Sequence, residues 1–171
     1  MKMAAERDIA ADPGVVWAAL LDKDVLKECV PGCQEMTGSA AEGFEAVVVQ
    51  KVGPVKATFR GSVTLSDLVV GESLTLSGVG MGGAAGFAKG GANVRLQAIE
   101  AGTRLIYDVE AKVGGKLAQL GSRIIDGFAK KMADQFFQRF QETVEGPGEE
   151  AEDGEMESGE KKGWLKRLVK S

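Results

Sequence analysis

Alternating hydrophobic and polar positions predict an antiparallel sheet in the middle of the chain. Apolar side chains occupy every second position in Val55–Arg60 and in Ser73–Leu76, which is the period of a strand with one buried face. Turn signals such as Gly53-Pro54 separate these segments. The pattern predicts strands over residues 44–52, 55–68, 73–79, 92–99 and 103–113.

Helical patterns lie on both sides of these strands. Asp12-Pro13 can cap and begin a short helix, and a second short helix is predicted over residues 22–28. Further on, apolar side chains recur every fourth residue from Leu120 to Val144, which predicts one long amphipathic helix over residues 116–144. We therefore expect an α+β fold, in which a curved antiparallel sheet wraps around a long C-terminal helix and encloses an apolar cavity.

The amino-acid composition excludes several kinds of catalytic and metal site. The 171 residues include no histidine and two cysteines, and the formal net charge is −4. Without histidine there is no Ser-His-Asp or Cys-His nucleophile system and no histidine-ligated zinc, so we predict no catalytic residues and no metal site. The negative charge also argues against nucleic-acid binding, which requires clustered basic residues.

Two residue pairs leave alternatives open. Cys29 and Cys33 form a C-x₃-C motif; a disulfide or metal pair is one interpretation, and structural thiols are the simpler one in a chain without further ligands. Asp108 and Glu110 share a predicted strand face, which suits either acid–base chemistry or a solvated surface.

The segment from Gly78 to Gly91 is half glycine. Gly78–Gly83 matches the dinucleotide fingerprint G-x-G-x-x-G, but that motif needs a following helix, and a strand pattern follows here. We instead expect a strand–turn segment over the cavity. Glycine loses more conformational entropy on folding than other residues, so this density of glycine needs a reason. Either a flexible flap for ligand entry or a tight backbone approach would explain it.

Charge divides the chain into three parts. Residues 1–144, the predicted domain, are nearly neutral, whereas residues 145–160 carry eight acidic residues and no basic one and are predicted to be a disordered linker. Residues 161–171 carry five basic residues and an apolar helix face, which predicts a tail that lies in the surface of an anionic membrane. Its predicted membrane-binding residues are Lys161, Lys162, Trp164, Leu165, Lys166, Arg167, Leu168, Val169 and Lys170.

Four segments of the predicted domain carry the motifs of one family. They are VPGC at 30–33, KVGPVKATFRG at 51–61, GGAAGFAKGG at 82–91, and VGGKLAQLGSR at 113–123, the last continued by KKMAD at 130–134 and Phe136-Phe137. Together they resemble the G-subunit family of carbon monoxide dehydrogenase, within the START-like, Bet v 1-like (SRPBCC) superfamily of helix-grip domains.

The resemblance implies a non-catalytic accessory subunit of an aerobic molybdenum-containing carbon monoxide dehydrogenase. Such a subunit recruits the enzyme to the cytoplasmic membrane, and we expect a quinone or other isoprenoid lipid in its cavity for electron transfer to the respiratory chain. We predict that the dehydrogenase docks on Lys51, Lys56 and Lys89. The predicted ligand-binding residues are Met81, Phe87, Leu117, Leu120, Ile124, Phe128 and Met132.

The sequence leaves two alternative functions open and also predicts a cellular location. The chain could be a purely structural membrane anchor or assembly factor without a ligand, or a cyclase-like enzyme, since related helix-grip domains include cyclases. Because neither a secretory signal nor a membrane-spanning run is visible, we expect a cytoplasmic protein that binds peripherally to the inner face of the cytoplasmic membrane.

Overall fold

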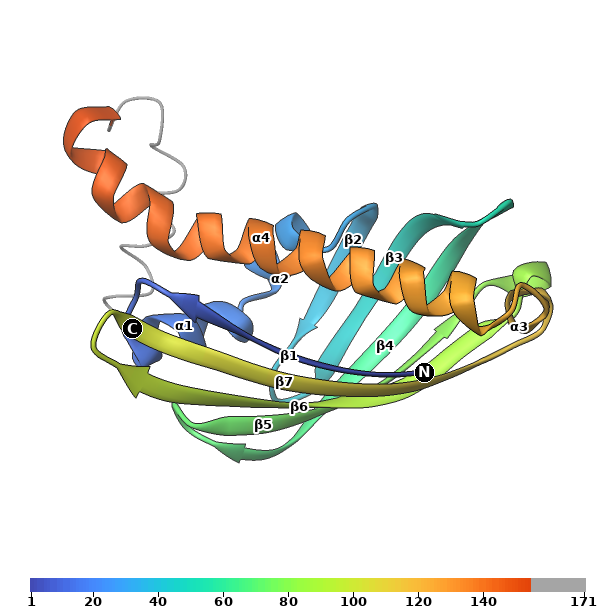
Figure 1. Ribbon diagram of the computed structural model, residues 1–171, viewed down its shortest axis with the longest axis horizontal. Helices are drawn as coiled ribbons and strands as arrows, with labels where there is room; N and C mark the ends of the chain where they lie inside the picture. The colour runs from blue at the N-terminus through green and yellow to red at the C-terminus, as the bar shows by residue number, and fades with distance from the viewer. Residues whose placement is uncertain (155–171) are drawn as a thin grey trace.

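A seven-stranded antiparallel sheet forms the body of the described chain (Figure 1). The computed structural model describes residues 1–154, with side chains described to residue 146. The strands lie in the order β1-β7-β6-β5-β4-β3-β2. Their bounds are β1 Lys2–Ile9, β2 Cys33–Ser39, β3 Gly43–Val52, β4 Val55–Val69, β5 Ser73–Met81, β6 Phe87–Ile99 and β7 Gly102–Gly114.

The strand predictions agree with β3 to β7 to within a few residues at most ends. The hydrophobic pattern did not predict β2, which contains one large apolar side chain, Met36, and lies at an edge of the sheet. Because an edge strand buries little, it carries a weak alternation signal. The α+β fold expected from the sequence, with a curved antiparallel sheet and a long C-terminal helix, is confirmed.

Two short helices cover one end of the sheet, as predicted. They are α1 (Pro13–Leu20) and α2 (Lys23–Cys29). The Asp22 carboxylate caps α2, because its Oδ1 accepts hydrogen bonds from the backbone N–H groups of Asp24 at 2.8 Å and Val25 at 3.3 Å.

The long C-terminal helix differs from its predicted bounds at both ends. A short helix, α3 (Lys116–Gln119), is separated from α4 (Ser122–Gly154) at Gly121, whose positive φ of 93° ends the first segment. The predicted end at residue 144 is too early, because the helix continues to Gly154 through part of the predicted linker. Glutamate is a good helix former, so acidic composition alone did not indicate the helix end. Residues 155–171 lie outside the described part of the chain.

The core lies where α1, α2 and α4 meet the sheet (Figure 1). Its fully buried members include Ile9, Val16, Val25, Leu105 and Phe140, each no more than 2% exposed. At the other end of the sheet lie the β3–β4 turn, the short 3₁₀ turn η1 (Gly83–Ala85) and α3.

The glycine-rich segment is a β-hairpin. Strands β5 and β6 pair in register through it, with Gly78 opposite Gly90 and Met81 opposite Phe87. A strand follows the G-x-G-x-x-G motif where a dinucleotide site requires a helix, so the motif has no such role here. At Gly90 an added Cβ would lie 2.3 Å from the Glu110 carbonyl oxygen. A tight backbone approach therefore explains this glycine.

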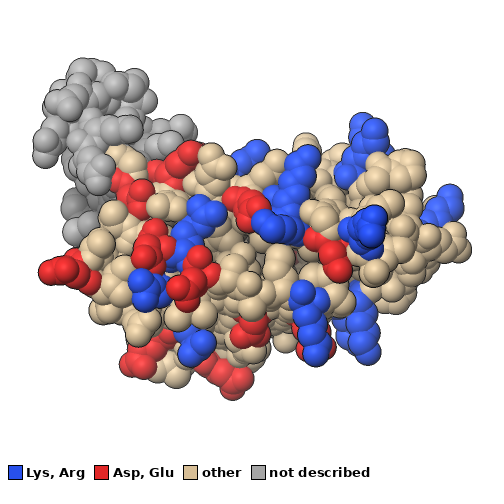
Figure 2. Space-filling model, viewed as in Figure 1, with Lys and Arg blue, Asp and Glu red and all other residues tan. Residues whose placement is uncertain are grey.

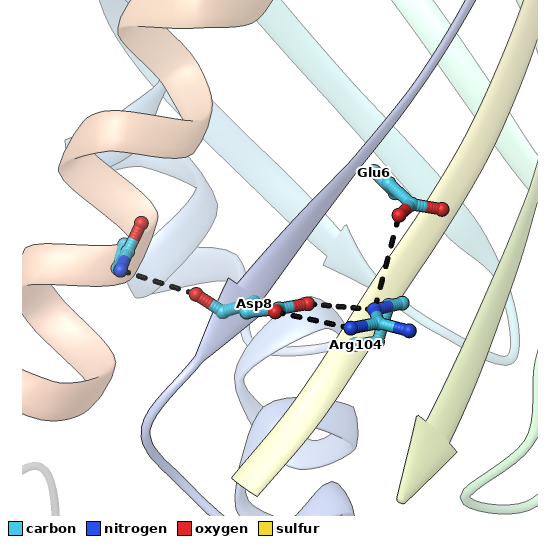
Figure 3. A network of polar contacts seen from close by, with 4 residues as sticks. Glu6, Asp8 and Arg104 are labelled. Atoms are coloured by element: carbon cyan, nitrogen blue, oxygen red, sulfur yellow. Dashed lines mark hydrogen bonds and ion pairs between the residues drawn. The ribbon is translucent and has the colours of Figure 1, made fainter. Parts of the chain in front are cut away.

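A polar network connects the first strand to the last strand and to α4 (Figure 3). The Arg104 guanidinium donates to both carboxylate oxygens of Asp8, at 2.8 and 3.3 Å, and lies 3.9 Å from Glu6. The Gln141 amide on α4 donates to the backbone oxygen of Asp8 at 3.3 Å. The hydrogen bond from Arg104 lowers the pKa of Asp8 below its ordinary value of 3.8.

We expect Phe140→Ala to lower the free energy of unfolding by about 3–5 kcal/mol, because a fully buried aromatic ring leaves a cavity when it is truncated. Urea denaturation measures this change. Arg139→Ala, at an exposed position of the same helix, should change stability by no more than about 0.5 kcal/mol. Similar values for both variants would contradict the packing described here.

We expect Arg104→Gln to raise the pKa of Asp8 toward 3.8, because the charged hydrogen-bond donor is lost. A lowered carboxyl pKa stabilises the fold above the ordinary pKa of aspartate, and this stabilisation is lost as the pH falls through the lowered value. The variant should therefore show a weaker dependence of stability on pH in this acidic range. NMR titration gives the pKa, and Glu6→Gln, which leaves the Asp8–Arg104 pair intact, should keep it low.

Candidate ligand-binding cavity

A cavity of about 530 Å³ lies between the sheet and the helices that cover it. Its walls come from strands β2 to β7 and from α1, α2 and α4. The volume falls within the range of about 300–1,000 Å³ that is common for small-molecule sites. The apolar cavity expected from the sequence is therefore present in the described structure.

The walls of the cavity are almost entirely apolar. On the sheet, the lining side chains occupy alternate positions, as the concave face of a pleated sheet requires. Lys89 and Glu110 also border the cavity, but by this alternation their side chains belong to the outer face. The principal lining residues are Phe44, Ala46, Val48, Phe59, Val63, Leu65, Leu74, Leu76, Ala92, Val94 and Val109 on the sheet, with Leu20, Leu26, Phe136 and Phe137 on the helices.

Small residues leave the floor of the cavity without side-chain volume. Gly61 and Gly80 are paired across β4 and β5, and Gly80 is in turn opposite Ala88 on β6. All three line the cavity, and a Cβ added to Gly80 would meet no heavy atom within 4 Å. The empty space is thus a direct result of residue size at adjacent register positions.

Aromatic side chains of α4 form one wall of the cavity. Phe137 stacks on Tyr107 of β7 with ring centroids 4.6 Å apart, and Phe136 meets Phe137 edge-on at 4.9 Å. Burial raises the pKa of Tyr107, and the nearby Asp134 carboxylate adds to the rise, so this phenol stays neutral at physiological pH. Phe136 and Phe137 line the cavity, whereas Phe140 is in the core.

None of the seven predicted ligand-binding residues is among those lining this cavity. Met81 and Phe87 are 55% and 40% exposed. They alternate with the lining residues Gly80 and Ala88, so the strand pleat directs them to the outer face. Met81 and Phe87, which were predicted to bind the ligand, therefore do not line the cavity.

The other predicted residues lie at the α3 end of the domain or earlier on α4. Leu117 is buried, and Leu120 and Ile124 lie next to Gly53 at the β3–β4 turn. Phe128 and Met132 are half-buried on α4. The sequence prediction placed the ligand on the first part of the apolar stripe, up to Met132, but the cavity is lined by Phe136 and Phe137, about one turn further along.

Most of the lining residues were missed because they lie on strands. A usable signal was present, since the alternation in Val55–Arg60 that predicted β4 also divides its side chains into two faces. The inward set of this strand continues as Phe59, Gly61, Val63 and Leu65, all of which line the cavity.

The remaining candidate groups are the two cysteines and the pair of Asp108 and Glu110. Cys29 and Cys33 are not joined in a disulfide, and burial raises the pKa of Cys33, which keeps its thiol protonated. Asp108 accepts a hydrogen bond from the Asn93 amide at 3.3 Å, and Glu110 forms an exposed ion pair with Lys2. Among the side chains that the structure describes, those of residues 1–146, no group of three or more acidic or cysteine residues is placed to hold a metal ion.

The predicted docking lysines lie on the outer face of the sheet. Lys51 is directly opposite Lys56 across β3 and β4, and Lys89 is opposite Lys112 across β6 and β7. Their contact with a dehydrogenase stays a prediction. The predicted membrane tail, 161–171, lies outside the described residues, and no helix of the described part is long and apolar enough to cross a bilayer.

Solved structures share this fold. A conserved protein from Geobacillus kaustophilus is 25% identical, with a TM-score of 0.80 over 86% of this chain and 97% of that protein. A protein from Chromobacterium violaceum, 19% identical, has a TM-score of 0.62 over 84% and 97% of the two chains. One from Thermus thermophilus, 15% identical, has a TM-score of 0.63 over the same shares.

The family comparison agrees with the motifs in the sequence. No curated protein matches the sequence significantly. The sequence model for CoxG, the G subunit of carbon monoxide dehydrogenase, matches residues 6–145, which include nearly all of the sheet, the cavity and the described side chains of α4. The chain therefore belongs to the CoxG family of carbon monoxide dehydrogenase accessory subunits.

Proposed function

We propose that this chain carries a quinone or related isoprenoid lipid in its apolar cavity as an accessory subunit of an aerobic molybdenum-containing carbon monoxide dehydrogenase. In this proposal the protein also recruits the enzyme to the inner face of the cytoplasmic membrane. Family membership suggests the accessory role. The observation that supports the ligand is a 530 Å³ cavity with almost wholly apolar walls.

The chemistry of the partner explains why such a ligand would be needed. Oxidation of carbon monoxide with water to carbon dioxide releases two electrons and two protons, and a quinone takes up both to become a quinol. Isoprenoid quinones are apolar, so burial in this cavity removes their surface from water at a gain of about 25 cal/mol per Å². The cavity walls offer no side chain suited to acid–base catalysis, which favours a carrier over an enzyme.

A purely structural anchor is the alternative, and bound ligand distinguishes the two. Organic-solvent extraction of the protein purified from its native host, followed by mass spectrometry, should yield an isoprenoid quinone in near-stoichiometric amount. Extraction of no lipid, together with no binding of added ubiquinone-1, would favour the anchor.

We expect Gly80→Ile to weaken binding of ubiquinone-1 by about tenfold, which corresponds to about 1.4 kcal/mol, because the new side chain would occupy the cavity. The fold should be retained, since β-branched residues suit strands. Binding is measured by isothermal titration calorimetry. Ser77→Ile is the matched control, since it places an isoleucine side chain on the exposed face of the same strand. Equal affinities of the two variants would place the ligand elsewhere.

We expect removal of residues 161–171 to weaken binding to vesicles that contain phosphatidylglycerol, because five basic residues are lost. Raised salt should weaken binding of the full chain for the same reason. Vesicle co-sedimentation measures both effects. If the full-length and shortened chains sediment equally, the tail has no part in membrane recruitment.

A further inference from the structure

Three segments that are distant in sequence meet at one end of the domain. They are the β3–β4 turn, the η1 turn between β5 and β6, and α3 (Figure 1). The α3 helix contacts both η1 and β7, and Gly53 of the β3–β4 turn lies beside the Leu120 and Ile124 side chains. We call this the α3 end.

The α3 end is strongly basic. Residues 51–60, 78–91 and 111–125, which lie at or next to it, contain seven basic residues and no acidic one. Lys and Arg side chains accordingly predominate at the right-hand end of the molecule (Figure 2). None of the seven forms an ion pair with another described residue. They are Lys51, Lys56, Arg60, Lys89, Lys112, Lys116 and Arg123.

Exposed apolar side chains lie among these charges. Val79, Met81 and Phe87 are 37%, 55% and 40% exposed. Met81 and Phe87 are opposite each other on β5 and β6, and Val79 is opposite Lys89. Because Arg60 is opposite Met81, basic residues border the apolar group on adjacent strands. Large exposed apolar side chains rimmed by polar groups mark interaction surfaces.

We propose that the α3 end is a membrane-contact surface of the domain itself, which docks on a bilayer containing anionic phospholipids, with Met81 and Phe87 entering the interface. The composition favours lipid over protein as the partner, so this proposal is an alternative to docking of the dehydrogenase on Lys51, Lys56 and Lys89. Five of the seven basic residues are lysine, which is depleted at protein–protein interfaces. At a membrane surface, lysine keeps its ammonium group among the headgroups while its aliphatic stem lies along apolar groups.

The position of this surface relates it to the cavity. Met81 and Phe87 are the immediate neighbours in sequence of Gly80 and Ala88, which line the cavity on the opposite face of the same strands. A Cβ on Gly82 would lie 2.5 Å from the ring of Phe59, another lining residue. The hairpin end therefore forms the outer surface at one side and the cavity wall at the other, and docking there brings the cavity to the lipid.

Vesicle binding by four full-length proteins tests the proposal. Wild type, Met81→Ser/Phe87→Ser, Lys89→Glu/Lys112→Glu and Leu68→Ser/Val70→Ser are compared on vesicles of phosphatidylcholine with and without phosphatidylglycerol. Leu68 and Val70 provide the matched control, because they are 41% and 81% exposed at the β4–β5 turn, away from the α3 end. Both α3-end variants should bind phosphatidylglycerol vesicles at least fivefold more weakly, and the control should bind like wild type.

The same substitutions in chains without residues 161–171 separate this surface from the tail. The shortened chain should keep weak, phosphatidylglycerol-dependent binding, and Met81→Ser/Phe87→Ser should remove it. Thermal melting verifies that each variant is folded. If the Phe87 substitution destabilises the hairpin, the Lys89→Glu/Lys112→Glu variant still tests the surface. Wild-type vesicle binding by both α3-end variants would overturn the proposal. If both α3-end variants bind vesicles like wild type but no longer co-purify with the dehydrogenase, the proposal is also overturned and the surface is assigned to a protein partner.

Discussion

The shortage of side-chain volume on part of the concave sheet face governs the rest of the structure. Gly61, Gly80 and Ala88 lie at adjacent register positions and fill almost no space, while the Phe136 and Phe137 rings occupy the space under α4. The aromatic rings hold α4 away from the sheet, and the glycines and alanine opposite leave part of the space between them unfilled. The cavity follows from this mismatch, as does its apolar character, because strand alternation sends the charged groups outward.

The buried core of the domain adjoins its cavity. Side chains such as Val16, Leu105 and Phe140 are completely buried where α1, α2 and α4 meet the sheet, and burial of this kind supplies most of the folding free energy. Leu20 and Leu26, on the same short helices, already border the cavity. Leu74 and Val94 belong to both the core and the cavity wall, so variation at the α3 end affects the core less than variation in the cavity does.

The sequence predicted the architecture better than the site. Alternation in β4 and the Asp12-Pro13 helix start are local signals, so the elements could be placed to within a few residues. The site depends on which stretch of a continuous apolar stripe faces the empty part of the sheet, and only tertiary packing decides this. Met81 and Phe87 show the same limit, because alternation divides a strand into two faces without saying which of them is inward.

The pairing of β1 with β7 has a consequence for synthesis of the chain. Lys2 pairs with Glu110 and Ile9 with Thr103, so β1 leaves the ribosome well before the strand that pairs with it. At about 5–20 residues per second, this delay is on the order of 5–20 s. Over that interval β1 is an unpaired strand, and its charged residues, Lys2, Glu6, Arg7 and Asp8, act as gatekeepers that disfavour association with other nascent chains.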